Sequence, residues 1–270
     1  YKMVKIFADH DYEVTVYPTR ARLDCTRKVL EDAGRFDLVV CCGGDGTLNE
    51  MVSGMMQRQD RRPMGYIPLG STNDLAVSLR LPTRVEEAAL RAVTGNEFHM
   101  DVGTLNDRYF NYIAAFGAFT ETSYATPQEI KNALGHLAYI LEGVKSLGKI
   151  LPIHVKITAD DEQFEEDYLF GAVTNTISLG GVLKLDPEKV LLDDGMYELL
   201  LVKNPTNALE AQAMLTAIMT QNFDGPLVKM FHASDITFES SHEISWTIDG
   251  EYGGTFSHTH ILNNKNAVTL

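Results

Sequence analysis

Several features that mark other protein classes are scarce in this chain of 270 residues. Its apolar runs are far shorter than the roughly 20 residues that a membrane-spanning helix needs, which argues against an integral membrane protein. The chain holds 23 Lys and Arg against 37 Asp and Glu, a net charge of −14. Because nucleic-acid phosphates are bound by an excess of basic residues, this balance also argues against nucleic acid as a partner.

Cysteine is also scarce, with three residues, Cys25, Cys41 and Cys42. Two are adjacent and the count is odd, so the sequence carries no disulfide framework and fits a reducing cytosol. We expect Cys41 and Cys42 to fill a buried strand. His258 and His260 share one face of an expected strand, but no third metal ligand is evident, so packed or solvated histidines are the preferred interpretation.

Two familiar phosphoryl-transfer signatures are missing as well: the GxxxxGK[ST] P-loop and the HRD and DFG motifs of protein kinases. The chain instead carries two glycine-rich turns, Gly43–Thr47 and Gly70–Asp74, each directly after a short apolar run. A strand, a glycine turn and a helix start form a geometry that binds phosphate on backbone N–H groups. On parallel strands both turns would lie at the carboxyl edge of the sheet, where open α/β sheets bind ligands.

The first third of the chain has the rhythm of a doubly wound α/β domain. We expect helices over residues 1–12, 20–33, 48–57 and 84–93, and strands over 13–17, 36–42 and 64–69. The first strand of such a sheet would precede residue 1, so we expect this domain to be incomplete at its N-terminus.

From about residue 99 short strands replace this rhythm, and they predict a mainly antiparallel β-sandwich. We expect a hairpin turning at Asn106–Asp107, strands over 153–158, 168–175, 195–202, 235–239 and 244–249, and helices over 129–147 and 209–219, the last capped by Thr206 or Asn207. The expected domains are 1–99 (α/β) and 100–254 (β-rich), with 255–270 as a strand that returns to the first domain.

Several acidic residues are candidates for chemistry, and most of them also have a structural interpretation. Asp45 and Asp74 stand beside the glycine turns and suit a hard cation bound to phosphate, but Asp74 also suits a helix N-cap. Asp249-Gly250-Glu251 follows an alternating strand, so it is either a hairpin turn or a pair of carboxylates that accept a hydroxyl proton. Asp194-Gly195 is either a type I′ turn or part of a cation site.

Together these motifs resemble one family. GGDGTLNE (Gly43–Glu50), PLGSTND (Pro68–Asp74) and DGE (Asp249–Glu251), with Gly180-Gly181 and Leu192–Gly195 between them, resemble the soluble bacterial diacylglycerol kinase and lipid kinase family over nearly the whole chain. GGDGT alone is shared with NAD kinases and sphingosine kinases. The later PLGSTND and DGE motifs make the resemblance more specific.

The resemblance implies an ATP-dependent kinase that phosphorylates the hydroxyl of diacylglycerol or a related lipid with the help of Mg²⁺. The positions that match nucleotide contacts of the family are Thr19, Gly43, Gly44, Asp45, Gly46, Thr47, Leu48, Asn49, Glu50, Gly70, Ser71, Asn73 and Asp74. Asp45 and Asp74 match the carboxylates that manage the catalytic Mg²⁺ or its water shell. Ser71 stands where many members have Thr and keeps the hydroxyl.

The resemblance also implies the remaining site residues. Asp249 is the first choice for the catalytic base and Glu251 the second, and the sequence does not separate their roles. A structural Mg²⁺ site is implied at the Asp194 carboxylate and the carbonyl groups of Leu191 and Met196. Asp101 matches an acidic position that supports the site.

The chain departs from the family pattern in its absent opening strand and in Asp186-Pro187, which replaces the more common Ala-Pro. The amphipathic helix expected over 129–147 either faces the core or shields acyl chains. The resemblance implies a cytoplasmic protein that touches the membrane transiently, and a homodimer. The alternatives are an NAD kinase and a non-catalytic nucleotide-binding regulator of the same fold, although the intact acidic residues argue against the latter.

Overall fold

The computed structural model describes residues 1–118, 151–179, 183–185 and 190–270, and the chain divides into two compact units. Unit 1 comprises residues 1–112, 176–195 and 264–270, and unit 2 comprises 113–175 and 196–263. No helix in the described part of the chain is long and apolar enough to cross a membrane. The helix expected over 129–147, the Gly180-Gly181 pair and Asp186-Pro187 lie outside the described residues.

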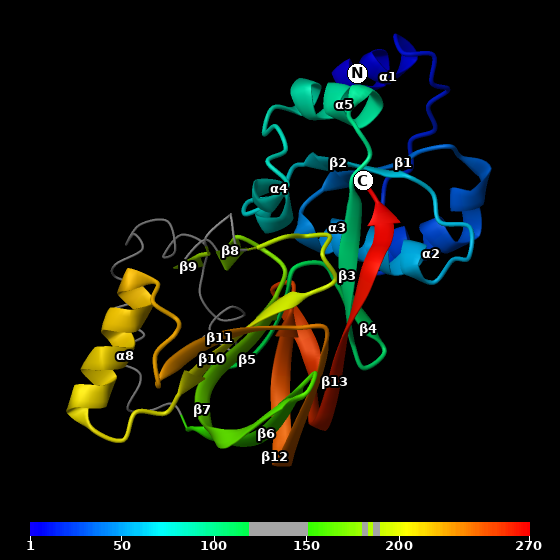
Figure 1. The fold of residues 1–270 in the computed structure, drawn as a ribbon. Coiled ribbons are helices and arrows are strands. Elements are labelled where there is room, and N and C mark those ends of the chain that lie inside the picture. Colours follow the sequence, from blue (N-terminus) through cyan, green and yellow to red (C-terminus); the bar gives the residue numbers. More distant parts are fainter. Residues whose placement is uncertain (119–150, 180–182, 186–189) are drawn as a thin grey trace. The chain divides into compact units, whose positions relative to one another are not determined.

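Unit 1 begins with alternating helices and strands (Figure 1). These are α1 (Lys2–Ala8), α2 (Asp24–Asp32), the 3-10 helix η1 (Ala33–Arg35), β1 (Val39–Gly43), α3 (Asp45–Met56), β2 (Met64–Pro68), α4 (Asp74–Ser78) and α5 (Val85–Thr94). β1 and β2 pair in parallel, with Val39 opposite Met64 and Gly43 opposite Pro68. The α/β class predicted for this part of the chain is confirmed, because α3 is the crossover that parallel neighbours require.

Helices cover both faces of the β1–β2 pair. On one face Phe7 of α1, Ile67 of β2 and Ala88 and Ala89 of α5 form one buried cluster. On the other face α3 packs against β1, and α2 packs against α3 (Figure 1). A Cβ on Gly54 of α3 would stand 2.9 Å from the Val29 Cβ of α2, so the glycine lets the two helices approach closely.

The strand expected over residues 13–17 is not formed. The segment lies outside any ladder, and Val16 is 69% exposed, while Val14 packs against the buried cluster of α1 and α5. In the part of the chain that the structure describes, β1 pairs with β2 alone. The prediction was wrong because alternation supplies a suitable face but no neighbouring strand to accept the backbone hydrogen bonds.

The rest of unit 1 is built from β structure. β3 (His99–Leu105) and β4 (Arg108–Phe110) form the predicted hairpin, which turns at Asn106–Asp107. The C-terminal end of β13 (Glu251–Thr269) runs beside β3, and Phe98 and Leu270 exchange two backbone hydrogen bonds of 2.8 Å. A short antiparallel pair, β8 (Ser178–Leu179) and β9 (Leu183–Lys184), completes the described elements of this unit.

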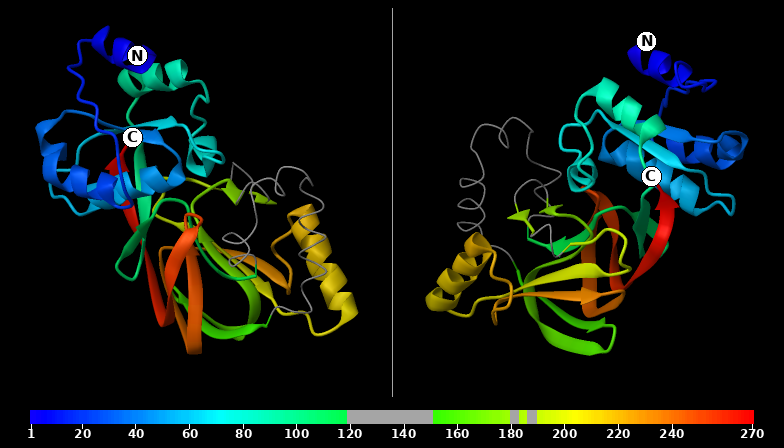
Figure 2. Two further views of the ribbon diagram at one scale, coloured as in Figure 1. Left: turned by 180° about the vertical axis from the view of Figure 1, so that it is seen from behind. Right: turned by 45° about the horizontal axis from the view of Figure 1, so that its top comes forward.

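Unit 2 is mainly antiparallel, as predicted. Its elements are β5 (Ile113–Gly117), β6 (Ile153–Ala159), β7 (Glu162–Thr174), β10 (Tyr197–Lys203), α8 (Ala208–Thr220), β11 (Val228–Ala233), β12 (Asp235–Ile248) and the first part of β13. The strand order is β11-β10-β7-β5-β12-β13, and β6 pairs with both β7 and β12 (Figure 2). Because β6 joins two strands of the same sheet, the sheet curls around its own core.

Aromatic side chains fill that core. Trp246 of β12 lies opposite Phe116 of β5, with ring centroids 5.0 Å apart, and Phe238 lies 4.9 Å from Trp246. At the start of α8 the Asn207 side chain accepts a hydrogen bond from the Glu210 N–H, and Glu210 accepts hydrogen bonds from Thr206 in return. This reciprocal capping confirms the predicted start of the helix.

The strands of unit 2 differ from the prediction at several places, and β5 was not among the expected strands. The two strands expected over 235–239 and 244–249 are one strand, β12, whose register shifts between Glu239 and Ile244. The polar residues between them form an irregularity in the ladder and not a turn. β7 begins at Glu162, earlier than expected, and β11 was not predicted.

Candidate active site

The two glycine turns of unit 1 are in direct contact. Gly44 ends the turn after β1 and Gly70 begins the turn after β2, and a Cβ built on Gly44 would stand 3.1 Å from the Gly70 Cα. The Leu69 N–H donates a hydrogen bond of 2.8 Å to the Gly43 carbonyl oxygen. The register of β1 and β2 brings Gly43 opposite Pro68, which explains why both turns lie at one edge. The geometry predicted for these loops is therefore present.

The first turn has no room for a side chain at Gly43 and is followed by backbone N–H groups that no described side chain caps. A Cβ on Gly43 would stand 2.8 Å from both the Cβ and the Oγ1 of Thr47, so this position has no room for a side chain. Gly44 occupies the N-cap position of the twelve-residue helix α3, and no side chain of the described residues caps that helix end. The first N–H groups of α3 therefore have no acceptor from a capping side chain, which is the arrangement that binds phosphate oxygens.

The second turn is shaped by Asn73. Its Oδ1 accepts hydrogen bonds from the Gly70 N–H at 2.9 Å and from the Tyr66 hydroxyl at 3.2 Å, and its Nδ2 donates to the Gly70 carbonyl oxygen at 2.8 Å. Asn73 has φ +51°, a left-handed conformation that Asn tolerates well. Its side chain is thus used to fold the loop, while the Ser71 side chain is exposed.

Asp45 joins the two turns through its carboxylate. Burial raises the pKa of Asp45, and the backbone N–H groups of Asp74, Asn73 and Leu75, at the start of α4, act against this rise by hydrogen bonding to it. Asp74 is itself 4% exposed, and Asn73 holds the N-cap position of α4. The alternative interpretation of Asp74 as the N-cap is therefore wrong.

One carboxylate oxygen of Asp45 is a candidate ligand of the predicted cation. Its Oδ1 is buried, and among the described residues no donor lies within hydrogen-bond distance of it. A buried carboxylate oxygen that lacks a donor suits a cation. The described residues contain no group of three His, Cys, Asp or Glu side chains that could hold a metal. The residues thus fit a Mg²⁺ ion shared with nucleotide phosphates and water, and not a cage of protein ligands.

Three other residues of the first motif have side chains engaged elsewhere. Leu48 is fully buried, and Asn49 donates from Nδ2 to the Tyr109 carbonyl oxygen of β4 at 3.1 Å. Glu50 accepts hydrogen bonds from the Leu23 N–H at 2.7 Å and the Cys25 N–H at 3.1 Å. The structure therefore gathers Gly43 to Thr47 at the turn and directs the next three side chains into the packing around α3.

Asp101 is buried at the centre of a backbone network in unit 1. Its Oδ2 accepts a hydrogen bond from the Gly195 N–H and its Oδ1 from the Asn266 N–H, both at 2.7 Å. Its own N–H donates to the Leu192 carbonyl oxygen at 2.9 Å. Asp101 therefore fixes the turn at residues 192–195 to the end of β13.

The ligands predicted for the structural Mg²⁺ site are placed in both units. In unit 1 Leu191 is exposed, and the Lys265 Nζ donates to the Asp194 carbonyl oxygen at 3.0 Å. In unit 2 the Met196 carbonyl oxygen accepts a hydrogen bond from the Asn263 Nδ2 at 3.3 Å. The alternative type I′ turn at Asp194-Gly195 is wrong, because Gly195 has φ +86° but Asp194 does not have a positive φ.

Asp249 and Gly250 form the turn between β12 and β13 in unit 2. Both have positive φ, +47° and +82°, as a two-residue type I′ hairpin turn requires. Asp249 is 6% exposed, and its Oδ1 accepts a hydrogen bond from the Ile113 N–H at 3.2 Å. Glu251, the first residue of β13, is exposed. The two carboxylates thus differ in environment: one is buried and hydrogen-bonded to β5, and the other is open to solvent.

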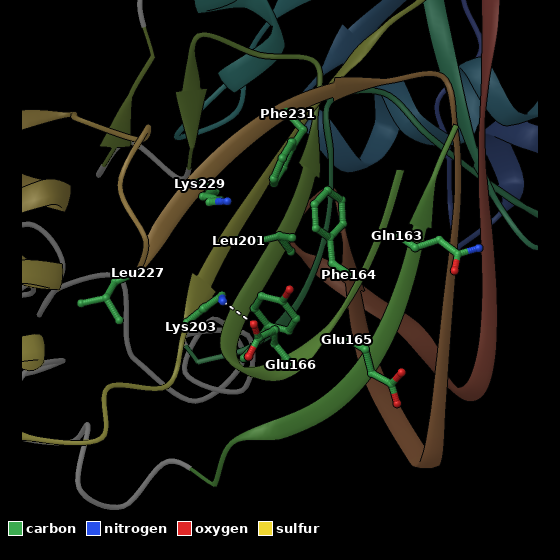
Figure 3. A pocket seen from close by; sticks show the side chains of 10 residues that line it. Gln163, Phe164, Glu165, Glu166, Leu201, Lys203, Leu227, Lys229 and Phe231 are labelled. Atoms are coloured by element: carbon green, nitrogen blue, oxygen red, sulfur yellow. Dashed lines mark hydrogen bonds and ion pairs between the residues drawn. The ribbon is translucent and has the colours of Figure 1, made fainter. Parts of the chain in front are cut away.

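Two cavities lie apart from these turns. In unit 1 a cavity of about 630 Å³ extends beside β2 and α5, and Leu191 is among its lining residues. In unit 2 a smaller pocket of about 220 Å³ lies over β7, β10 and β11 (Figure 3). Phe164 and Phe231 face one another there with centroids 4.4 Å apart, beside an ion pair of 2.6 Å between Lys203 and Glu166. None of the predicted site residues lines this smaller pocket.

Comparison with known proteins shows the family to which the chain belongs. Residues 1–105 match the model of the diacylglycerol kinase catalytic domain, and residues 119–266 match the YegS C-terminal NAD kinase beta sandwich-like domain. The chain is 32% identical to a diacylglycerol kinase of Bacillus subtilis, over 98% of this chain and 90% of that protein. It is 34% identical to a diacylglycerol kinase of Staphylococcus epidermidis, over 90% of this chain and 77% of that protein.

The fold agrees as well. A crystal structure from Bacillus anthracis strain Sterne, named as a candidate diacylglycerol kinase, superposes with a TM-score of 0.83 at 26% identity, covering 99% of this chain and 89% of that one. The turns, the two sequence matches and the superposition define a phosphotransferase that uses an alcohol group as acceptor. The chain belongs to the diacylglycerol kinase family.

Proposed function

We propose that the protein transfers the γ-phosphate of ATP to the hydroxyl group of diacylglycerol or a closely related lipid. The observation that supports this most strongly is the contact of the turns at Gly44 and Gly70, with the Asp45 carboxylate between them. Two bare backbone turns at one edge of parallel strands suit a polyphosphate better than they suit a single phosphate group.

In this proposal unit 1 binds the nucleotide. The N–H groups at the start of α3 and the glycines of both turns receive the phosphates, and the exposed Ser71 hydroxyl is available to them. Asp45 and Asp74 would hold Mg²⁺ together with the phosphates and water. When bound, the ion neutralises phosphate charge. The Asp45 Oδ1, which has no hydrogen-bond donor among the described residues, supports this role.

The acceptor proton is assigned to the turn of unit 2. As the lipid oxygen forms its bond to the γ-phosphorus, the bond from that phosphorus to ADP breaks and the hydroxyl proton passes to a carboxylate. The family resemblance makes Asp249 the first choice for this task and Glu251 the second. The exposure of Glu251 and the hydrogen bond between Asp249 and the Ile113 N–H favour the reverse order, with Glu251 as the proton acceptor and Asp249 holding the turn.

The acceptor would be met at a bilayer surface, since diacylglycerol partitions into membranes. We therefore propose a transient, peripheral contact between the protein and the bilayer.

An acceptor panel tests this function. The protein is incubated with γ-³²P-labelled ATP, Mg²⁺ and one acceptor at a time: dioleoylglycerol in phosphatidylcholine vesicles, phosphatidylglycerol, sphingosine or NAD. The proposal expects label in phosphatidic acid, formed one-to-one with ADP, and lost in Glu251→Gln. Label in NADP would favour the NAD kinase alternative. Nucleotide binding without transfer to any acceptor would favour a regulator and overturn the proposal.

A further inference from the structure

Glu50 of α3 forms hydrogen bonds with the start of α2, and these bonds are not contacts with the nucleotide. It lies on α3, five residues after Asp45, or about 7.5 Å along the helix axis at 1.5 Å per residue. Its carboxylate accepts hydrogen bonds from the Leu23 N–H at 2.7 Å and the Cys25 N–H at 3.1 Å, at the start of α2. Its carbonyl oxygen accepts a further bond from the Thr26 hydroxyl at 2.8 Å.

The start of α2 needs such a partner. Leu23 is its N-cap residue, and a leucine side chain cannot accept a hydrogen bond from the first N–H groups of the helix. Leu23 also has φ +66°, a strained conformation for a branched residue. Glu50 supplies from α3 the acceptor that α2 lacks, and its negative charge is favourable at the positive end of the α2 dipole.

The segment that Glu50 restrains is Pro18–Leu23, which is exposed throughout and carries Thr19, the predicted nucleotide contact. Its other end is held by Asp24, whose carboxylate accepts hydrogen bonds from the Arg20 N–H at 3.0 Å and the Tyr17 hydroxyl at 3.1 Å. Two carboxylates thus fix a loop that belongs to no ladder. Asp24 holds the segment from the adjoining first residue of α2, whereas Glu50 anchors it to α3, the helix that begins at the first glycine turn.

We propose that Glu50 is a positioning residue of the nucleotide site, which acts by holding the Pro18–Leu23 segment and not by touching the nucleotide. This inference rests on the proposed function for the identity of the ligand. Both Glu50 oxygens already accept backbone hydrogen bonds. A carboxylate would also repel phosphate, so a direct contact with the nucleotide would require these bonds to break.

The Glu50→Gln variant tests the proposal, because it keeps the size of the side chain but removes its charge. Arg20 and Arg22 are exposed within the segment, so trypsin cleavage after them, followed by mass spectrometry, reports how often the segment opens. Arg84, whose side chain is 74% exposed, serves as the reference cut. The control is Glu31→Gln, on α2, which removes an exposed carboxylate that contacts Arg27.

The proposal expects cleavage after Arg20 and Arg22 to rise about tenfold in Glu50→Gln at an unchanged Arg84 rate. The KM for ATP should rise about tenfold with kcat changed by less than about threefold, and Glu31→Gln should match the wild type. A raised KM with unchanged cleavage would instead show a direct contact and overturn the proposal. Unchanged cleavage and unchanged KM would overturn it too.

Two further outcomes are separable. If cleavage after Arg84 rises together with cleavage after Arg20 and Arg22, the Glu50→Gln variant has lost its fold, and Glu50→Asp is used instead. Its shorter carboxylate should partly loosen the segment while the Arg84 rate stays constant. Cleavage of Glu50→Asp at the wild-type rate would contradict the proposal. If the wild type transfers phosphate to no acceptor, the proposed function fails, but cleavage with and without ATP and Mg²⁺ still tests the segment. Absence of ATP protection there would overturn the positioning role.

Discussion

Gly44 and Gly70 lie back to back, with the Cα of Gly70 3.1 Å from the place where a Cβ of Gly44 would stand. They are 26 positions apart in the sequence, and the absence of a Cβ on each glycine allows the two backbones to come this close. Because backbone atoms meet backbone atoms here, no rotamer change can relieve a clash. This contact makes one phosphate-facing edge out of two separate turns.

We expect Gly70→Ala to destabilise the protein by about 2 kcal/mol and to weaken ATP binding at least tenfold, because its Cβ would meet the Gly44 Cα at 2.6 Å. Chemical denaturation and nucleotide titration measure the two effects. Gly225→Ala is the control, since a Cβ there comes no closer than 3.9 Å to the Val228 carbonyl oxygen. Equal stability of the two variants would contradict the tight contact.

Asp45→Asn should separate stability from activity. Burial raises the pKa of Asp45, so the charged form costs free energy in the nucleotide-free protein at neutral pH. For a carboxyl with a raised pKa this cost appears as pH rises through the folded-state pKa and is absent at acid pH. The variant should therefore melt about 2 °C higher than the wild type at pH 7, with phosphoryl transfer lost. A lower melting temperature at pH 7 would refute this account of the Asp45 environment.

Asp101→Ala should cost about 3 kcal/mol of unfolding free energy, because it leaves the Gly195 and Asn266 N–H groups without their buried acceptor. Asp193→Ala changes an exposed residue of the 192–195 turn and should alter the unfolding free energy by less than about 0.5 kcal/mol. Urea unfolding compares the two. A small effect of Asp101→Ala would mean that other groups, and not this carboxylate, fix the 192–195 turn.

Asp24 should make a stability contribution that depends on pH. Its hydrogen bond to Arg27, followed by that to the Arg20 N–H, holds the pKa of Asp24 below its ordinary value. A lowered carboxyl pKa stabilises the fold above the unfolded-state value of about 3.9, and this is lost as pH falls through the folded-state pKa. Asp24→Asn should therefore melt below the wild type at pH 7 and alongside it near the acid limit. A melting difference that does not depend on pH would argue against a charge effect.

The glycine turns could be predicted because their chemistry is local. The apolar runs before Gly43 and Gly70, the glycines and the polar helix starts each point to a strand, a turn and a helix, and parallel pairing then brings the two turns to one edge. The Asn106–Asp107 hairpin and the Thr206–Asn207 cap could be predicted for the same reason. In each of these places sequence neighbours determine the structure.

Predictions from the sequence were wrong where a residue far away in the chain determines the local structure. Residues 13–17 alternate as a strand does, but no neighbouring ladder accepts them in the described structure. The polar residues after Glu239 resemble a turn, but they form an irregularity in the ladder, and β12 pairs with β13 again from Ile244 onward. Glu50 belongs to the glycine motif in sequence, yet its partners lie 25 and 27 positions away. These strand pairings and helix contacts depend on tertiary structure, which a single sequence does not display.

In the proposed reaction the turns at Gly44 and Gly70 bind the nucleotide, and the Asp249–Glu251 turn receives the proton of the acceptor hydroxyl. Glu251→Gln is the decisive variant, because Glu251 is the exposed carboxylate of this turn and the substitution keeps the size of the side chain while it removes the charge. Its Kd for ATP, by titration, and its kcat with dioleoylglycerol vesicles are measured on the same preparation. We expect a Kd within about twofold of the wild type and a kcat lower by at least about 100-fold. A kcat close to that of the wild type would contradict the proposed reaction.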